Sequence, residues 1–170
     1  MIYPRSTLAA LFSAPVHPGK VVWIGLRPAR RQQPLSVQTA MAEAGKGLVE
    51  DHYPGCGDGK RQITLIEAEG LAAIASYLRT GSIDPASLRR NLVTQGINLL
   101  ALKDKRFRVG AALLEYTGEC HPCSRMEENL GVGGYNAVRG HGGITARVLA
   151  GGEIRVGDVI NVAEHAVPID

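Results

Sequence analysis

Two cysteines three residues apart, Cys120 and Cys123, are the side chains of this sequence best suited to chemistry. A thiolate is a nucleophile and a ligand for soft metals, so such a pair can hold a metal, carry a sulfur atom or act as a redox dithiol. Pro122 stiffens the approach to Cys123 and removes one backbone donor. An apolar run precedes the pair, and Ser124-x-x-Glu127 after it is typical of a helix start, which predicts a strand-to-helix loop.

Residue types and spacing leave three interpretations of this pair open. A structural zinc site needs four ligands, but Cys56 lies far upstream and His141 and His165 have no ligand spacing. A thioredoxin-like dithiol has this local order, yet it also needs a parallel β-α-β pattern that the rest of the sequence does not supply. In the third interpretation, the cysteines are small, partly buried residues that only pack.

Composition limits the classes of partner. A chain of 170 residues is long enough for one domain with a substantial core. Nineteen basic and sixteen acidic residues give a net charge of +3, which is too mild to indicate nucleic-acid binding. Aromatic residues make up 5%, so platforms for base stacking are not expected.

The same features predict a cytoplasmic protein that does not bind a membrane. The apolar stretch at residues 8–12 is too short for a membrane span, and its short length and the preceding Pro4 argue against a signal peptide. Three cysteines are an odd number and form no disulfide framework, which favours a reducing compartment.

Short apolar runs bounded by glycine or proline are the strongest structural signals. They predict strands at residues 20–24, 61–66, 107–116, 145–149, 153–156 and 159–162, with a Gly-Gly hairpin between the fourth and fifth. Leu71, Ile74 and Leu78 lie on one face of a helix expected over residues 67–79. Asp84-Pro85 is an N-cap followed by proline, which predicts a short helix over residues 86–91. The fold class is therefore mostly β (α+β), with a closed, barrel-like core and a few short helices.

Two polar stretches are candidates for anion binding. In residues 131–143, glycines allow close backbone approach, and Arg139 and His141 favour an anion-binding lid over an ordinary flexible loop. In residues 89–96, Arg89 could bind phosphate with two N–H groups and Asn91 could orient a ring, although a solvated helix end is an equally simple interpretation. Residues 54–60 lack the spacing of a phosphate-binding loop and are expected to form a surface loop.

Seven short motifs in one order resemble the MOSC domain, which is named for the C-terminal domain of molybdenum cofactor sulfurase. The motifs are Gly47-Leu48-Val49-Glu50-Asp51, residues 61–65, Arg89-Arg90-Asn91-Leu92 with Gly96, residues 107–110, Cys120-His121-Pro122-Cys123, residues 143–152 and Gly157-Asp158. Each motif is weak alone, but the order is specific. The resemblance spans residues 20–162, with an N-terminal extension at 1–19 and a C-terminal tail at 163–170.

The resemblance implies a β-barrel fold that binds molybdenum cofactor, a pterin with a dithiolene and a phosphate. It assigns Cys123 as the metal ligand or sulfur carrier. Some members of the family reduce N-hydroxylated compounds. Others are parts of sulfurases with a pyridoxal-phosphate domain; this chain has no such domain, so we do not expect a complete sulfurase, and nothing in the sequence supports a pyridoxal-phosphate site.

By this resemblance the chain is expected to be a reductase of small N-hydroxylated substrates, supplied with electrons by a donor protein. The alternative is a non-enzymatic carrier that hands sulfur or cofactor to a partner protein. The expected cofactor-binding residues are Arg89, Asn91, Arg139, His141, Gly143 and Arg147. Cys120 and His121 are candidates for supporting contacts around the metal.

Overall fold

The computed structural model describes residues 7–53 and 58–163, and within these ranges seven strands close a β-barrel. Around the barrel the order is β11-β7-β8-β9-β5-β6-β1, and β1 pairs again with β11. A closed sheet leaves no long edge unpaired, which suits a chain with many short strands. The barrel strands are β1 (Gly19–Leu26), β5 (Ile63–Glu67), β6 (Leu92–Gln95), β7 (Arg106–Val109), β8 (Ala112–Glu119), β9 (Ile144–Ala150) and β11 (Val159–Val162). This confirms the expected mostly-β, barrel-like fold.

β1 takes part in the closure and also carries an extra strand. Near its start Gly19 pairs with Ile160 of β11, and near its end Ile24 pairs with Val37 of β2 (Leu35–Val37). Apolar side chains fill the barrel, and the largest ones, among them Phe107 and Leu65, are fully buried. Their burial removes a large apolar area from water and is the main term that stabilises the barrel.

The run expected as a single strand over residues 107–116 is two strands, β7 and β8, joined by a tight turn. Gly110 has φ of 54°, in the left-handed region, and a Cβ there would lie 2.3 Å from Asp158 Oδ2. Only glycine fits this turn without strain. The expectation of one continuous strand was therefore wrong, because Gly110 reverses the chain in the middle of an apolar run.

The expected Gly-Gly hairpin between residues 145–149 and 153–156 was also wrong. β10 (Gly152–Arg155) pairs with β3 (Thr39–Glu43) and, among the described residues, has no pairing with β9. A Cβ on Gly151 would lie 2.6 Å from Ala42 O, and one on Gly152 would lie 2.5 Å from the carbonyl carbon of Ala111. These glycines let the chain pass close to neighbouring backbone and enter a second sheet, β10-β3-β4, in which β4 is Gly47–Leu48.

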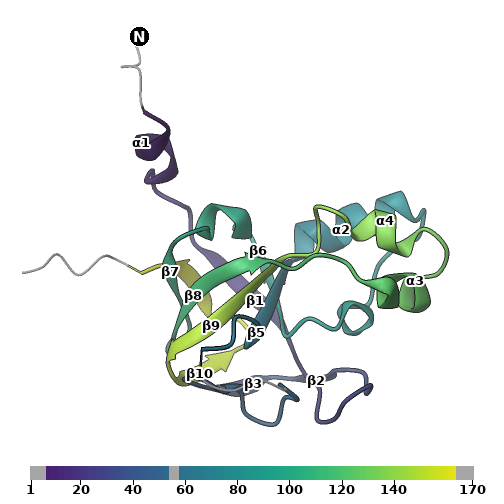
Figure 1. Ribbon diagram of the computed structural model, residues 1–170, viewed down its shortest axis with the longest axis horizontal. Coiled ribbons are helices and arrows are strands. Elements are labelled where there is room, and N and C mark those ends of the chain that lie inside the picture. Colours follow the sequence, from purple (N-terminus) through teal and green to yellow (C-terminus); the bar gives the residue numbers. More distant parts are fainter. Residues whose placement is uncertain (1–6, 54–57, 164–170) are drawn as a thin grey trace, which may run out of the picture.

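Helices gather at one side of the barrel, as Figure 1 shows for α2 (Ala68–Tyr77), α3 (Ser124–Leu130) and α4 (Gly134–Val138). β5, α2 and β6 form a parallel β-α-β unit, a pattern that the sequence did not reveal. A second apolar cluster packs these helices on the sheet; it comprises Ile66, Leu71, Ile74, Leu88, Val93, Met126, Ala137 and Val138. The predicted helix over residues 67–79 is confirmed, with Leu71 and Ile74 on its buried face.

Three short helices complete the described chain. η1 (Pro85–Leu88) is a 3-10 helix whose N-cap, Asp84, accepts a hydrogen bond from Ala86 N at 3.0 Å, as its sequence predicted. η2 (Leu99–Leu102) is a second 3-10 helix, and α1 (Leu8–Phe12) projects from the barrel away from the other α-helices (Figure 1). None of the helices in the described ranges is long and apolar enough to cross a membrane.

Candidate functional site

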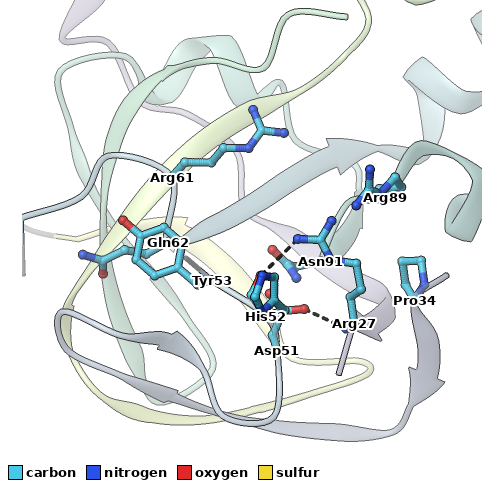
Figure 2. A pocket seen from close by; sticks show the side chains of 9 residues that line it. All are labelled: Arg27, Pro34, Asp51, His52, Tyr53, Arg61, Gln62, Arg89 and Asn91. Atoms are coloured by element: carbon cyan, nitrogen blue, oxygen red, sulfur yellow. Dashed lines mark hydrogen bonds between the residues drawn. The ribbon is translucent and has the colours of Figure 1, made fainter. Parts of the chain in front are cut away.

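A cavity of about 350 Å³ opens where β1 ends and β5 and β6 begin (Figure 2). Three arginines line it, together with residues that precede β2 and follow β4. The lining residues are Arg27, Pro34, Asp51, His52, Tyr53, Arg61, Gln62, Arg89 and Asn91. Two residues of the predicted motif at 89–91 therefore contribute to a real cavity.

Arg27 is clamped to the segment that follows β4. Its backbone N–H donates to Asp51 Oδ1 at 2.7 Å, its Nη2 donates to His52 O at 3.0 Å, and His52 N donates to Arg27 O at 2.6 Å. Figure 2 shows Arg27 beside His52, with Arg61 and Arg89 on either side. The Nε atom of Arg27 is buried and has no hydrogen-bond partner among the described residues. A buried donor without an acceptor costs about 1–3 kcal/mol, so this atom favours a bound acceptor.

Asn91 forms the floor of the cavity rather than a free recognition group. Its Oδ1 accepts from Thr64 N at 3.0 Å and from Thr64 Oγ1 at 3.1 Å, and its Nδ2 donates to Gly25 O at 3.3 Å. The buried side chain thus joins β1, β5 and the start of β6. Through this junction, the ends of three strands hold the cavity in shape.

Arg89 contributes positive charge at the cavity rim. It caps the C-terminus of η1 in a left-handed conformation, with φ of 57°. Burial lowers the pKa of Arg89 from its ordinary value, and the charges of Arg27, Arg125 and Arg61 lower it further, while Cys123 acts in the opposite direction. Like charges held this close together favour an anionic ligand.

Arg90 fastens the segment before β9 to the end of η1. It is 3% exposed; its Nε donates to Gly142 O at 2.8 Å and its Nη1 donates to Leu88 O at 2.6 Å. Its Nη2 is buried and without a partner in the described part of the chain. Burial lowers the pKa of Arg90, whereas the charges of Cys120 and then Cys123 act to raise it.

Gly142 and Gly143 bring the backbone of two segments into contact. A Cβ on Gly142 would lie 2.1 Å from Cys120 O, and Cys120 N donates to Gly143 O at 2.8 Å. Gly143 has φ of 81°, and a Cβ on it would lie 1.8 Å from Leu65 O. Gly143, expected to bind the cofactor, therefore has a packing requirement of its own.

The expected strand-to-helix loop is confirmed, with Cys120 buried and Cys123 exposed immediately before α3. The Ser124-x-x-Glu127 cap is not formed, because the Glu127 carboxylate accepts instead from Gly133 N at 2.7 Å and Tyr135 N at 2.9 Å. α3 is fixed to η1 by Asn129, whose Nδ2 donates to Ser87 O at 2.8 Å. This contact holds α3, which Cys123 precedes, against η1, which Arg89 caps.

Three other expected cofactor residues do not line this cavity. Arg139 is exposed, and its Nη1 lies 3.5 Å from Asn136 Oδ1. His141 Nε2 lies 3.3 Å from the hydroxyl of Tyr77 on α2. Arg147, on β9, forms an ion pair with Glu115 at 3.2 Å. The glycine-rich stretch 131–143 contains α4, so it is not the continuous loop that its composition indicated.

The described residues form neither a zinc site nor a thioredoxin-like dithiol arrangement at the cysteine pair. Within residues 7–53 and 58–163, no three His, Cys, Asp or Glu side chains are placed to hold a metal ion. Cys56 and His165 lie outside the described residues. The parallel β-α-β unit involves β5, α2 and β6 and not the cysteine loop, so a thioredoxin-like arrangement is not present around Cys120 and Cys123.

Sequence reasoning missed Arg27, Arg125, His52 and Tyr53, and gave Arg61 no role. The sequence did contain a signal: Arg27 directly follows the apolar run that forms β1, and Arg61 lies just before the apolar run that forms β5. That signal shows which residues sit at strand ends. It does not show that β1, β5 and β6 bring those ends to one place, which depends on strand order.

Comparison with known proteins agrees with this architecture. The family model of the MOSC domain matches residues 41–161. The YuaD protein of Bacillus subtilis has a similar structure, with a TM-score of 0.76, 20% identity and coverage of 86% of this chain and 96% of that one. YiiM of Escherichia coli has a TM-score of 0.66 and 17% identity, over 86% of this chain and 71% of its own.

YiiM of Geobacillus stearothermophilus is similar at a TM-score of 0.65 and 16% identity, over 88% of this chain and 77% of that one. No curated protein matches the sequence. At these identities the solved structures support the fold, and the matched family model supports the membership. The chain belongs to the MOSC domain family.

Proposed function

We propose that this protein binds molybdenum cofactor and reduces N-hydroxylated compounds, with Cys123 as the protein ligand of the metal. The observation that carries the proposal is a cavity lined by three arginines, together with an exposed thiol just before α3, a helix that a hydrogen bond fastens to η1, which Arg89 of the cavity caps. Molybdenum cofactor combines a phosphate with a soft metal, and these two parts need an anion cradle and a thiolate.

The residues present fit such a group. The buried Nε of Arg27 lacks an acceptor among the described residues, and a phosphate oxygen would supply one. The volume of about 350 Å³ lies at the lower end of the range of roughly 300–1,000 Å³ that is usual for ligand pockets.

Each residue then has a physical task. Arg27, Arg61 and Arg89 would hold the phosphate, and Asn91 would keep the cavity floor in place. Cys123, whose thiol is exposed, would hold the metal as a thiolate ligand. When bound, the cofactor supplies two-electron chemistry able to take oxygen from an N–OH group. The roles of Arg139, His141, Gly143 and Arg147 in cofactor binding, and an electron-donor protein, stay predictions.

Turnover of a hydroxylamine or amidoxime by the purified protein, with a reduced viologen as electron donor, tests the proposal. The protein is expressed in a host that makes the cofactor. We expect amine or amidine product from the wild type, and less than about 1% of that rate from Cys123→Ala, because the metal loses its protein ligand. Arg108→Ala, an exposed site on β7, is the control and should retain full activity. Equal turnover by Cys123→Ala would overturn the assignment.

A second candidate, a carrier of sulfur or cofactor, is favoured by one observation: the thiol of Cys123 is exposed and thus accessible to another protein. This candidate predicts a cyanide-labile persulfide on Cys123 in the isolated protein. It also predicts no turnover with a chemical electron donor. Product formation in the viologen assay would exclude a carrier without enzymatic activity.

A further inference from the structure

The short helix α1 leaves all of its large apolar side chains in solvent. Leu8 is 71% exposed, Leu11 59% and Phe12 73%, and none of the residues of this helix is buried. The helix projects from the barrel away from α2, α3 and α4 (Figure 1). Exposed leucine and phenylalanine side chains gathered in one segment indicate a surface that binds another apolar phase.

A hydrogen bond joins α1 to a row of cations on the barrel. Lys105, immediately before β7, donates from its Nζ to Phe12 O at 2.8 Å. On β7 itself, Arg106 and Arg108 are exposed and alternate with buried residues, so both arginines point outward from the barrel. Lys103, two residues before Lys105, is exposed as well. The apolar helix therefore lies beside positive charge.

The same outer surface continues across β11 to the start of β1. Asn161 on β11 is the register partner of Arg108, and Val159, which is 55% exposed, is the partner of the exposed Lys20 on β1. The apolar side chains of α1, Val159 and five cations are called the α1 face below; the cations are Lys20, Lys103, Lys105, Arg106 and Arg108.

The carboxylates near these cations do not cancel their charge. Glu115, across from β7, forms an ion pair with Arg147 at 3.2 Å. Asp158 accepts a hydrogen bond from Arg155 N at 2.8 Å. Asp104 is exposed between two lysines of the face. The α1 face thus combines exposed apolar side chains with an excess of positive charge, and a partner that fits it offers an apolar phase behind a layer of negative charge.

We propose that the α1 face binds the surface of an anionic lipid bilayer, with the side chains of α1 among the acyl chains and the cations at the lipid phosphates. A second copy of the chain fits less well, because two such faces would bring like charges together. A protein partner needs a groove shaped for α1, whereas acyl chains accommodate a projecting helix. Nucleic acid offers no apolar phase for Leu8, Leu11 and Phe12.

This binding goes beyond the proposed reductase and does not depend on it. Neither α1, β7 nor β11 contributes a residue to the cavity that Arg27, Arg61 and Arg89 line. The sequence-based expectation that the protein does not bind a membrane considered the length that a membrane span requires. A helix that lies at the bilayer surface needs no such length.

Co-sedimentation of the full chain with lipid vesicles tests the inference without any cofactor. Vesicles of phosphatidylcholine alone are compared with vesicles that also contain the anionic phosphatidylglycerol. We expect the wild type to bind the anionic vesicles at least about 10-fold more tightly than the neutral ones. We also expect this preference to shrink as the salt concentration rises from about 0.05 to 0.5 M, because salt screens the cations.

Two double variants separate the apolar contribution from the charged one. Leu11→Ser with Phe12→Ser should lower the partition coefficient on anionic vesicles by about 10- to 100-fold, since two apolar side chains no longer leave water. Arg106→Gln with Arg108→Gln should lower it by about 10-fold. Leu35→Ser is the matched control, because Leu35 is 62% exposed but lies on β2, outside the α1 face, and should bind as the wild type does.

Absence of wild-type binding to anionic vesicles, or an equal loss in Leu35→Ser, would overturn the inference. Hydrogen exchange of the wild type guards against misfolded variants: anionic vesicles should slow exchange at residues 8–12 and leave residues 35–37 unchanged. Unchanged exchange at residues 8–12 would count against the α1 face. Self-association without lipid that Leu11→Ser with Phe12→Ser abolishes would assign the face to a second copy and overturn the lipid proposal.

Discussion

Asn91 was expected to bind the cofactor, but its side chain has a structural role. Its amide satisfies Thr64 on β5 and Gly25 on β1, the strands on either side of β6, so little of it is left for a ligand. The arginine next to the cavity, Arg89, keeps its guanidinium for a ligand. The motif of residues 89–91 thus combines one residue at the cavity rim, Arg89, with two, Arg90 and Asn91, whose hydrogen bonds join neighbouring segments.

Replacing Asn91 should therefore destabilise the fold. Asn91→Ala leaves Thr64 N and Oγ1 without their buried acceptor, and we expect a loss of about 2–4 kcal/mol in the free energy of unfolding. Urea unfolding followed by tryptophan fluorescence measures this loss. Gln95→Ala, exposed at the end of β6, is the control. An unchanged unfolding midpoint for Asn91→Ala would show that the amide has no structural role.

Gly143 allows a second prediction at this scale. Gly143→Ala places a Cβ 1.8 Å from Leu65 O at a φ of 81°, so the two segments must separate. We expect a loss of more than about 2 kcal/mol in the free energy of unfolding. Gly133→Ala is a matched control, since Gly133 has a similar φ of 89° with ψ of −3° and nothing within 4 Å of the added atom. Its loss should be roughly 1 kcal/mol, from backbone strain alone. Similar losses at both sites would contradict the packing argument.

Among the helices and strands, the sequence predicted those that depend on local periodicity. It did not predict strand pairings that depend on contacts between distant segments. α2 follows from Leu71 and Ile74 at helical spacing. The β7–β8 turn was missed because Gly110 interrupts an apolar run of uniform appearance, and the β9–β10 pairing was wrong because β3, far upstream, competes for β10. The helix start after Cys123 was predicted, but the partner of Glu127 was not, since it belongs to the next helix.

Glu127 connects α3 to the start of α4, and this connection should depend on pH. Hydrogen bonds from the backbone of Tyr135 and then Gly133 lower the pKa of Glu127. A lowered pKa in the folded state means that the stabilisation is present above the unfolded value of about 4.3 and is lost as pH falls through the folded pKa.

The free energy of unfolding should consequently fall more on acidification below about pH 4.3 in the wild type than in Glu127→Gln. Unfolding midpoints in urea across this range measure the difference. The neighbouring exposed Glu128, changed to Gln, is the control and should behave as the wild type does. Parallel acid profiles for Glu127→Gln and the wild type would refute the role of the carboxylate.

For the whole molecule, strand order creates the site. β1, β5 and β6 are adjacent in the barrel although far apart in sequence, and their ends gather Arg27, Arg61 and Arg89. The sequence allowed Cys123, Arg89 and Asn91 to be proposed. It grouped them on motif order with Arg139, His141 and Arg147, three residues that do not line this cavity and whose roles stay predictions.

An anion in this cavity should stabilise the entire fold, because a ligand that binds only the folded state shifts unfolding by mass action. Pyrophosphate is a suitable probe, since it is small and multiply charged. We expect it to raise Tm of the wild type by several degrees at saturating concentration, and to raise Tm of Arg89→Ala much less. Sodium chloride of equal ionic strength controls for screening. Equal shifts in both proteins would place anion binding outside the cavity.

The metal and pterin content of the purified protein shows whether it binds molybdenum cofactor and whether Cys123 is the metal ligand. Wild type and Cys123→Ala are purified side by side from a cofactor-sufficient host, and molybdenum per chain is measured together with the fluorescence of the oxidised pterin. We expect molybdenum and pterin in the wild type and loss of molybdenum in Cys123→Ala, with both proteins folded. Equal molybdenum in the two proteins would contradict the assignment of Cys123, and a wild type without either component would contradict the cofactor itself.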